Sequence, residues 1–199
     1  PVLGQEVGSW LIFQQPTTIV DCTVGYGGHA EMLLMTSPVG TRVIGLDQDS
    51  QAIEFSQRRL NRFGDRIVLR QGNYRDLKSH LAEAGIAKVG GVLFDFGVSS
   101  PQLDDPSRGF SFQREGPLDM RMDQTITLTA AHIINDYSEG ELYALFTTLA
   151  QEKRARAISS ALVRARKIKS IATTGELVAV IKSVTGPQKA KLHPATKVF

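Results

Sequence analysis

The sequence predicts an α/β fold, in which a parallel sheet with helices on both faces is followed by a helical module. Three observations predict this fold. Four short runs rich in β-branched residues lie in the first 95 residues, helical patterns separate these runs, and only helical patterns follow residue 128. Short apolar runs bounded by turn residues are typical of buried strands. Their alternation with helices is typical of parallel strands joined by right-handed crossovers.

The four predicted strands do not alternate between polar and apolar residues, as expected of strands covered by helices on both faces. They occupy residues 18–20, 42–46, 66–69 and 91–94, and the residues that follow them are Asp21, Asp47, Arg70 and Asp95. Helices are predicted over residues 30–34, 51–63 and 77–84.

Residues 97–124 are rich in Gly, Pro, Ser and Asp and show no periodicity, which is typical of a long functional loop. The helical region that follows contains two capping boxes, Ser138 with Glu141 and Thr173 with Glu176. A stripe at helical spacing is predicted to face a core, and it consists of Ala155, Ile158, Leu162 and Ala165.

The composition excludes several classes of protein. Of 199 residues, 42% are hydrophobic and 22% are charged, which excludes disordered and collagen-like chains. No apolar run approaches a membrane span, and the single cysteine, Cys22, excludes a disulfide framework, so a reducing cytoplasm is expected. Because the chain opens at Pro1 without Met and stops at Phe199, we expect it to be part of a longer protein.

Charge divides the chain into two parts. Residues 1–150 hold 12 Lys or Arg and 18 Asp or Glu, a net charge of −6, whereas residues 151–199 hold 11 and 2, a net charge of +9. The basic part is either a solvated helix face or a surface that contacts phosphates. The candidates for such contacts are Lys153, Arg154, Arg164, Arg166 and Lys167.

A glycine-rich loop, DCTVGYGGHA at residues 21–30, follows the first predicted strand and opens a helix. Gly25 and Gly27 suit a tight turn that a ligand approaches closely, and they match the dinucleotide pattern, so a nicotinamide-dependent dehydrogenase is one interpretation. S-adenosylmethionine is the other, because its cationic amino-acid end favours the carboxylate of Asp21, which would repel a pyrophosphate. A plain glycine turn remains a third possibility.

Further candidate residues follow the other predicted strands. The carboxylate of Asp47 can accept both hydroxyl protons of a ribose. Tyr74 offers a face on which an adenine can stack. Since parallel strands present their carboxyl ends at one edge, we expect Asp21, Asp47, Tyr74 and Asp95 to converge there.

Several stretches of the sequence are distinctive, namely FDFGVSSPQLDD (residues 94–105), RGFSF (108–112), GPLDMRMD (116–123) and HPAT (193–196). Together with the glycine loop, they resemble the bacterial 16S rRNA cytosine-N4 methyltransferase family from Pro1 to Phe199. The resemblance implies a class I methyltransferase with a Rossmann-like parallel sheet, incomplete here, and an inserted α-helical domain. It also implies the strand order 3-2-1-4.

The resemblance implies that S-adenosylmethionine is the donor and that small-subunit ribosomal RNA is the partner. Donor binding then falls on Gly27, Gly28, His29, Asp47, Tyr74, Asp95 and Gln102, to which the loop adds Asp21 and Gly25. The implied domains are a donor-binding domain at residues 1–103, a loop and helical recognition domain at 104–192, and a return to the sheet at 193–199.

The chain departs from the family at two places. TLAQE at residues 148–152 stands where the family usually has a Tyr-Gly-Glu-Glu-like stretch, which leaves the donor site untouched. The family also continues past HPAT with further strands, so we expect the sheet to be incomplete and its fourth strand to be an apolar edge.

Methylation of an exocyclic amine needs alignment and a group that accepts the amine proton. The hypothesis is that Asp95 or a backbone carbonyl of residues 96–100 accepts this proton, with Ser99 and Ser100 as second candidates. Asp95 could instead bind the donor without a role in the chemistry, and the two serines could cap a helix or a turn. Phe110, Phe112 and Met120 are either walls of a base pocket or packing residues.

One further interpretation remains. A non-catalytic RNA-binding protein with a vestigial methyltransferase fold is disfavoured by the intact glycine loop, Asp47 and Asp95. No metal site is predicted, because the acidic residues of the loop and the four histidines lack the spacing of an ion site.

Overall fold

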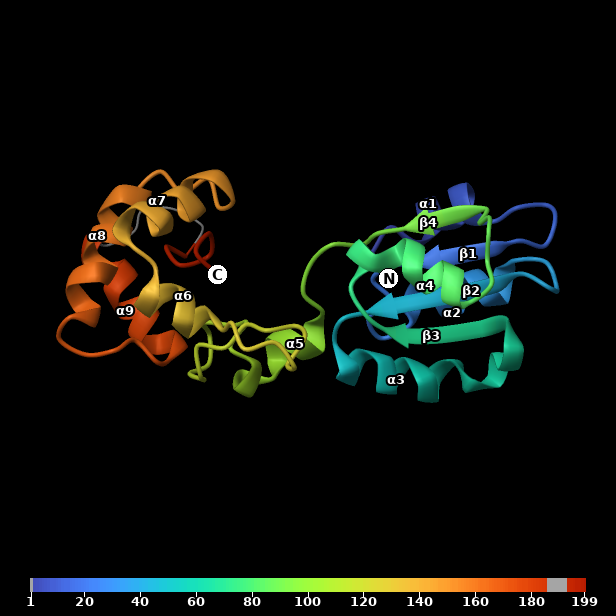
Figure 1. Ribbon diagram of the computed structural model, residues 1–199, viewed down its shortest axis with the longest axis horizontal. Coiled ribbons are helices and arrows are strands. Elements are labelled where there is room, and N and C mark those ends of the chain that lie inside the picture. The colour runs from blue at the N-terminus through green and yellow to red at the C-terminus, as the bar shows by residue number, and fades with distance from the viewer. Residues whose placement is uncertain (1, 186–192) are drawn as a thin grey trace. The chain divides into compact units, whose positions relative to one another are not determined.

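The computed structural model describes residues 2–185 and 193–199 (Figure 1). The chain divides into two compact units, one comprising Pro1–Ser99 and Met122–Gln124 and the other Ser100–Arg121 and Thr125–Phe199. The domain boundary proposed after residue 103 stays a prediction. Pro1 and the boundary proposed after residue 192 lie outside the described residues.

The first unit contains a parallel sheet whose four strands have the order β3-β2-β1-β4. The strands are β1 (Thr18–Asp21), β2 (Arg42–Asp47), β3 (Ile67–Gln71) and β4 (Gly91–Leu93). Ile19 of β1 pairs with Val43 of β2 and with Gly91 of β4. The structure therefore confirms the predicted α/β fold and strand order, and it leaves β4 at an edge of the sheet within the described residues.

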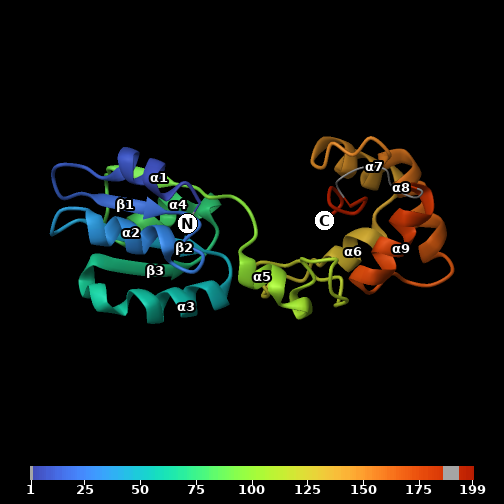
Figure 2. The ribbon, with the colours of Figure 1, turned by 180° about the vertical axis from the view of Figure 1, so that it is seen from behind.

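Helices cover both faces of this sheet, which Figures 1 and 2 show from opposite sides. The helices are α1 (Gly4–Leu11), α2 (Gly28–Thr36), α3 (Ser50–Leu60) and α4 (Leu77–Glu83). On one face, Ile19 and Val43 pack with residues of α1, α2 and α3. On the other face, Val20 and Ile44 pack with Leu77 and Leu81. Burial on both faces is the reason why the strands lack polar alternation.

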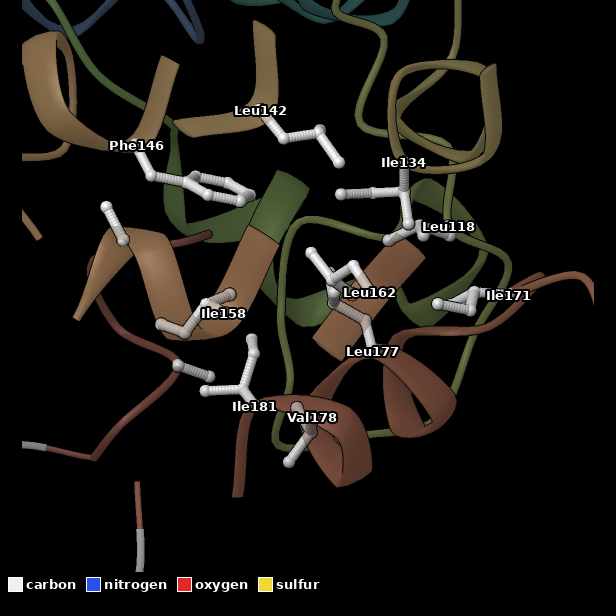
Figure 3. Close-up of a cluster of buried hydrophobic side chains, with 12 residues drawn as sticks. Leu118, Ile134, Leu142, Phe146, Ile158, Leu162, Ile171, Leu177, Val178 and Ile181 are labelled. Carbon is white, nitrogen blue, oxygen red and sulfur yellow. The ribbon is translucent and has the colours of Figure 1, made fainter. Parts of the chain in front are cut away.

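The second unit is helical, and its apolar core is drawn in Figure 3. Its helices are α5 (Ser100–Asp104), α6 (Ala130–Asp136), α7 (Glu139–Thr148), α8 (Ala155–Arg166) and α9 (Thr174–Thr185). Ile158 and Leu162 of the predicted stripe are fully buried, next to Phe146 and Leu177. The stripe of α8 is therefore a core face.

The segment predicted as a long functional loop over residues 97–124 contains α5 and a short 3-10 turn at Pro106–Arg108, so it is not a loop throughout. Pro101 explains the error. A proline suggests a break in a helix, but it is tolerated in the first turn, where a backbone N–H has no partner within the helix. No helix among the described residues is long and apolar enough to cross a membrane.

The predicted capping box of α7 is present. The hydroxyl of Ser138 accepts the N–H of Glu141, and the N–H of Ser138 donates to the Glu141 carboxylate at 2.7 Å. We expect Ser138→Ala to lower the free energy of unfolding by about 1 kcal/mol, because the N–H of Glu141 in the first turn loses its acceptor. Urea denaturation followed by circular dichroism measures this loss.

Ser183→Ala on α9 is the matched control, since its exposed hydroxyl donates within the same helix, to the carbonyl of Val180. It should change the unfolding free energy by less than about 0.5 kcal/mol. Equal losses in the two variants would contradict a capping role for Ser138.

Candidate functional site

The turn between β1 and α2 needs glycine at two positions. Gly25 has φ +51° and Gly27 has φ +80°, a region that residues with a side chain rarely adopt. A Cβ added to Gly27 would also lie 3.1 Å from Ser56 Oγ and 3.2 Å from Leu60 Cδ1. Glycine therefore keeps the loop close to α3, and Gly28 begins helix α2 directly after it.

Hydrogen bonds tie this loop to two neighbouring elements. The N–H of Gly25 donates to Asp47 Oδ2 at 2.8 Å, and the buried hydroxyl of Ser56 donates to the carbonyl of Gly25 at 2.7 Å. Ser56 lies on α3 and was missed by the sequence analysis, because a serine in a polar helix carries no signal. The loop is thus held by both β2 and α3.

Asp21 ends β1 and is fully buried. Its Oδ1 accepts the N–H of Thr23 at 3.2 Å, whereas Oδ2 has no hydrogen-bond partner among the described residues. Burial is the main reason why the pKa of Asp21 is raised to about 7. The hydrogen bond from Thr23 lowers this pKa, and the negative charges of Asp47 and Asp95 raise it. A buried carboxylate oxygen without a partner is a site for a cation or a hydrogen-bond donor.

Asp47 and Asp95 complete a cluster of three carboxylates with Asp21 at the carboxyl ends of β2, β4 and β1. Both oxygens of Asp47 accept backbone N–H groups, from Gly25 at 2.8 Å and from Asp49 at 3.0 Å. Burial, the largest effect, raises the pKa of Asp47. The structure brings these three predicted residues together, and their charges disfavour an anionic ligand.

His29 lies in the first turn of α2 and is buried. Its Nε2 is 2.8 Å from the carbonyl oxygen of Val2, and its Nδ1 is 3.8 Å from Asp95 Oδ2. The N–H of Asp95 donates to Thr23 Oγ1 at 2.7 Å. Thr23 therefore holds Asp21 and Asp95 together, a role the sequence analysis missed because one threonine in a loop carries no signal.

Tyr74 follows β3 and belongs to an aromatic cluster with Phe94 and Phe96. Its ring centroid lies 5.7 Å from that of Phe94 and 5.5 Å from that of Phe96. All three rings are exposed, and Phe96 is exposed by 68%. Tyr74 thus lies at the carboxyl ends of the strands, where it was expected, and its two aromatic neighbours flank Asp95 in the sequence.

The remaining predicted residues of the donor site and of catalysis lie around the division between the two units. Ser99 ends the first unit, whereas Ser100 and Gln102 belong to α5 of the second unit. Gln102 is buried in α5. The assignments of Ser99, Ser100 and Gln102 to the site stay predictions.

Two of the three loop residues considered as pocket walls pack inside the second unit. Phe112 stacks on His193 at 4.6 Å, and Met120 packs against the core. Phe110 lies under the guanidinium of Arg108 at 5.7 Å. Within the described residues, no group of His, Cys, Asp or Glu side chains has an arrangement that could hold a metal ion.

The basic residues around α8 differ in exposure. Arg166 is half-buried and donates to the carbonyl of Ile134 at 2.7 Å, so it contributes to the fold. Arg154 donates to the carbonyl of Thr185. Lys153, Arg164 and Lys167 are exposed, and Arg164 donates within α8 to Ser160 Oγ. Exposed cations on one helix and its flanks suit contacts with phosphates.

Comparison with known proteins adds a family model, described as the MraW methylase family, that matches residues 1–199. Three solved structures are also similar to the chain. A structure described as an rRNA methylase of Clostridium thermocellum is 25% identical, with a TM-score of 0.42, over 48% of this chain and 51% of that one.

A methyltransferase of Geobacter sulfurreducens is 23% identical over 39% of this chain and 40% of that one, and a protein-L-isoaspartate O-methyltransferase is 16% identical over 37% and 24%. Both have a TM-score of 0.34. The matched part of the chain thus spans about half the length of the rRNA methylase and less of the other two.

Proposed function

Because the chain belongs to the MraW methylase family, whose methyl donor is S-adenosylmethionine, we propose that it methylates the exocyclic N4 of a cytidine in small-subunit ribosomal RNA. The observation that carries the proposal is the cluster of Asp21, Asp47 and Asp95 beside a glycine loop. The proposed substrate belongs to the bacterial cytoplasm, and we propose that the chain acts there.

The residues of the first unit fit this donor. When bound, S-adenosylmethionine supplies an electrophilic methyl group on a cationic sulfonium, and it also carries an ammonium group. The buried Oδ2 of Asp21 has no partner within the described residues and suits a cation. Asp47 can accept ribose hydroxyls alongside its two N–H groups, and the exposed ring of Tyr74 can stack on the adenine.

The resemblance assigns Gly28, His29 and Gln102 to donor binding as well. Gly28 and His29 open α2, next to the loop that Gly25 and Gly27 bend. A dinucleotide fits this site poorly. The negative charges of its pyrophosphate would lie beside three carboxylates, which repel them, whereas a pyrophosphate is stabilised by cations or by backbone N–H groups that have no other acceptor.

Calorimetric titration of the chain with S-adenosylmethionine and, separately, with NAD⁺ tests the donor. The proposal requires saturable binding of S-adenosylmethionine and much weaker binding of NAD⁺. Binding of NAD⁺ alone would support the dehydrogenase interpretation. Binding of neither ligand, together with intact RNA binding, would support a non-catalytic RNA-binding protein.

Asp95 is the proposed acceptor of the amine proton. The N4 amine is a weak nucleophile because its lone pair is delocalised into the ring, and it gains positive charge as the new bond forms. A carboxylate within hydrogen-bond distance stabilises that charge. The hydrogen bond from the N–H of Asp95 to Thr23 Oγ1 fixes this residue, and Ser99 and Ser100 remain second candidates.

The exposed cations of α8 and its flanks are proposed to contact RNA phosphates, namely Lys153, Arg154, Arg164 and Lys167, while Arg166 has the structural contact described above. We expect the double variant Arg164→Ala and Lys167→Ala to weaken binding to small-subunit particles about 10-fold. The slope of log affinity against log salt should fall by roughly 1 to 2, because fewer counterions are released. Filter binding over a salt series measures both quantities.

The control for this prediction removes two exposed lysines of the first unit, Lys78 and Lys88, and so changes the net charge by the same amount. It should alter the salt slope much less than the α8 variant does. The RNA-facing role of α8 would be wrong if the two double variants behaved alike.

A further inference from the structure

The hydrogen bond of His29 with Val2 determines which ring nitrogen carries the hydrogen. Nε2 lies 2.8 Å from the carbonyl oxygen of Val2. A carbonyl oxygen can only accept a hydrogen bond, so Nε2 must be the N–H group. In the neutral ring, Nδ1 is then left without a hydrogen and carries a lone pair.

That lone pair faces a second acceptor. Nδ1 lies 3.8 Å from Asp95 Oδ2, which is beyond hydrogen-bond distance, so the two atoms must approach by about 1 Å before a proton can pass between them. The side chain of His29 is 7% exposed, whereas that of Asp95 is 41% exposed. The carboxylate is therefore open to a substrate, whereas the ring is buried.

Resting on the proposed function, we propose that His29 takes up the proton that Asp95 accepts from the amine during methyl transfer. As the bond from N4 to the methyl carbon forms, the bond from sulfur to that carbon breaks and its electron pair stays on sulfur. The N4 proton passes to Asp95 Oδ2 and then to His29 Nδ1. Both ring nitrogens then donate, Nε2 to Val2 and Nδ1 to the restored carboxylate of Asp95.

The His29 ring lies near charges of both signs. Asp95 Oδ2 is within 4 Å of Nδ1, and the N-terminus of α2, whose first turn contains His29, carries a partial positive charge of about half a unit. By taking up the proton, His29 returns Asp95 to its ionised form and so acts as a positioning residue.

Two variants separate the nitrogens. In His29→Gln, the amide nitrogen replaces Nε2 and keeps a donor for Val2, but the acceptor opposite Asp95 is lost. In His29→Asn, the amide nitrogen replaces Nδ1, and the contact with Val2 is lost. Single-turnover transfer at saturating S-adenosylmethionine should fall at least 10-fold in His29→Gln, and saturation removes any change in donor affinity from this rate.

Nitrogen-15 NMR of the imidazole rings in the free chain gives a readout that does not depend on activity. We expect His29 to be the Nε2–H tautomer and its Nδ1 resonance to move in Asp95→Asn, while His80 and His132 stay unchanged. An Nδ1–H tautomer would overturn the inference, because Nδ1 could not then accept a proton.

The transfer rates distinguish failure of this inference from failure of the proposed function. Slow transfer in Asp95→Asn with wild-type transfer in His29→Gln would overturn the role of His29 and leave the proposed function intact. Wild-type transfer in both variants would instead remove the chemical role of Asp95, and the role of His29 with it.

Discussion

Asp95→Asn is expected to slow single-turnover methyl transfer by about 10²- to 10³-fold, because general-base catalysis contributes roughly that much. The amide keeps the shape of the side chain and leaves the bond from the N–H of residue 95 to Thr23 Oγ1 in place. It cannot accept a proton, so the developing charge on N4 loses its acceptor. Donor affinity should change only a few-fold.

Rapid-quench transfer from radiolabelled donor and calorimetric donor binding separate the two effects. Asp65→Asn, which removes an exposed carboxylate of the same unit, is the control and should leave both quantities near the wild type. Weaker donor binding with an unchanged transfer rate in Asp95→Asn would make Asp95 a binding residue with no part in the chemistry.

Asp21→Asn is expected to stabilise the free chain at pH 8 and to weaken donor binding. The pKa of Asp21 is raised from 3.8 to about 7, so the folded chain keeps a proton that the unfolded chain releases between these values. This contribution to stability is present below about pH 4 and is lost as pH rises through 7. The difference of about three units corresponds to a penalty of about 4 kcal/mol at pH 8.

A neutral amide removes that penalty but buries an N–H group without a partner, so we expect a net gain of about 2 kcal/mol at pH 8. At pH 4.5 the gain should disappear, because Asp21 is then protonated in the folded state. Donor affinity at pH 8 should fall about 30-fold or more, since the carboxylate that faces the cation is gone.

Urea denaturation at the two pH values and calorimetry at pH 8 check these expectations. A variant less stable than the wild type at both pH values would show that the charge of Asp21 costs no stability. Unchanged donor affinity would show that Asp21 does not face the cationic part of the donor.

The sheet was predictable from the sequence because its strands are buried on both faces, so each reads as an uninterrupted apolar run such as Val43–Leu46. The order of the strands came from the family resemblance. Helix α5 was not predictable, because Ser100 and Pro101 suit a loop as well as a first helical turn, and contacts within the second unit decide between them.

The site was predictable where the type of a residue and its place after a strand indicate its chemistry. Asp21, Asp47 and Asp95 end predicted strands, and parallel pairing brings them to one edge. Thr23 and Ser56 were not predictable, since their roles come from hydrogen bonds across the fold, at separations of 72 and 31 residues. The aromatic cluster was not predictable either, because the sequence does not show that the rings of Phe94 and Phe96 lie beside that of Tyr74.

The central claim is methylation of a cytidine N4 in small-subunit RNA, and the most direct test is a product analysis. The chain is incubated with small-subunit particles that lack the modification and with S-adenosylmethionine labelled in its methyl group, and the RNA is digested to nucleosides. The account predicts label in N4-methylcytidine at a single position. Label in any other nucleoside or in protein, or no label from a chain that binds the donor, would contradict it.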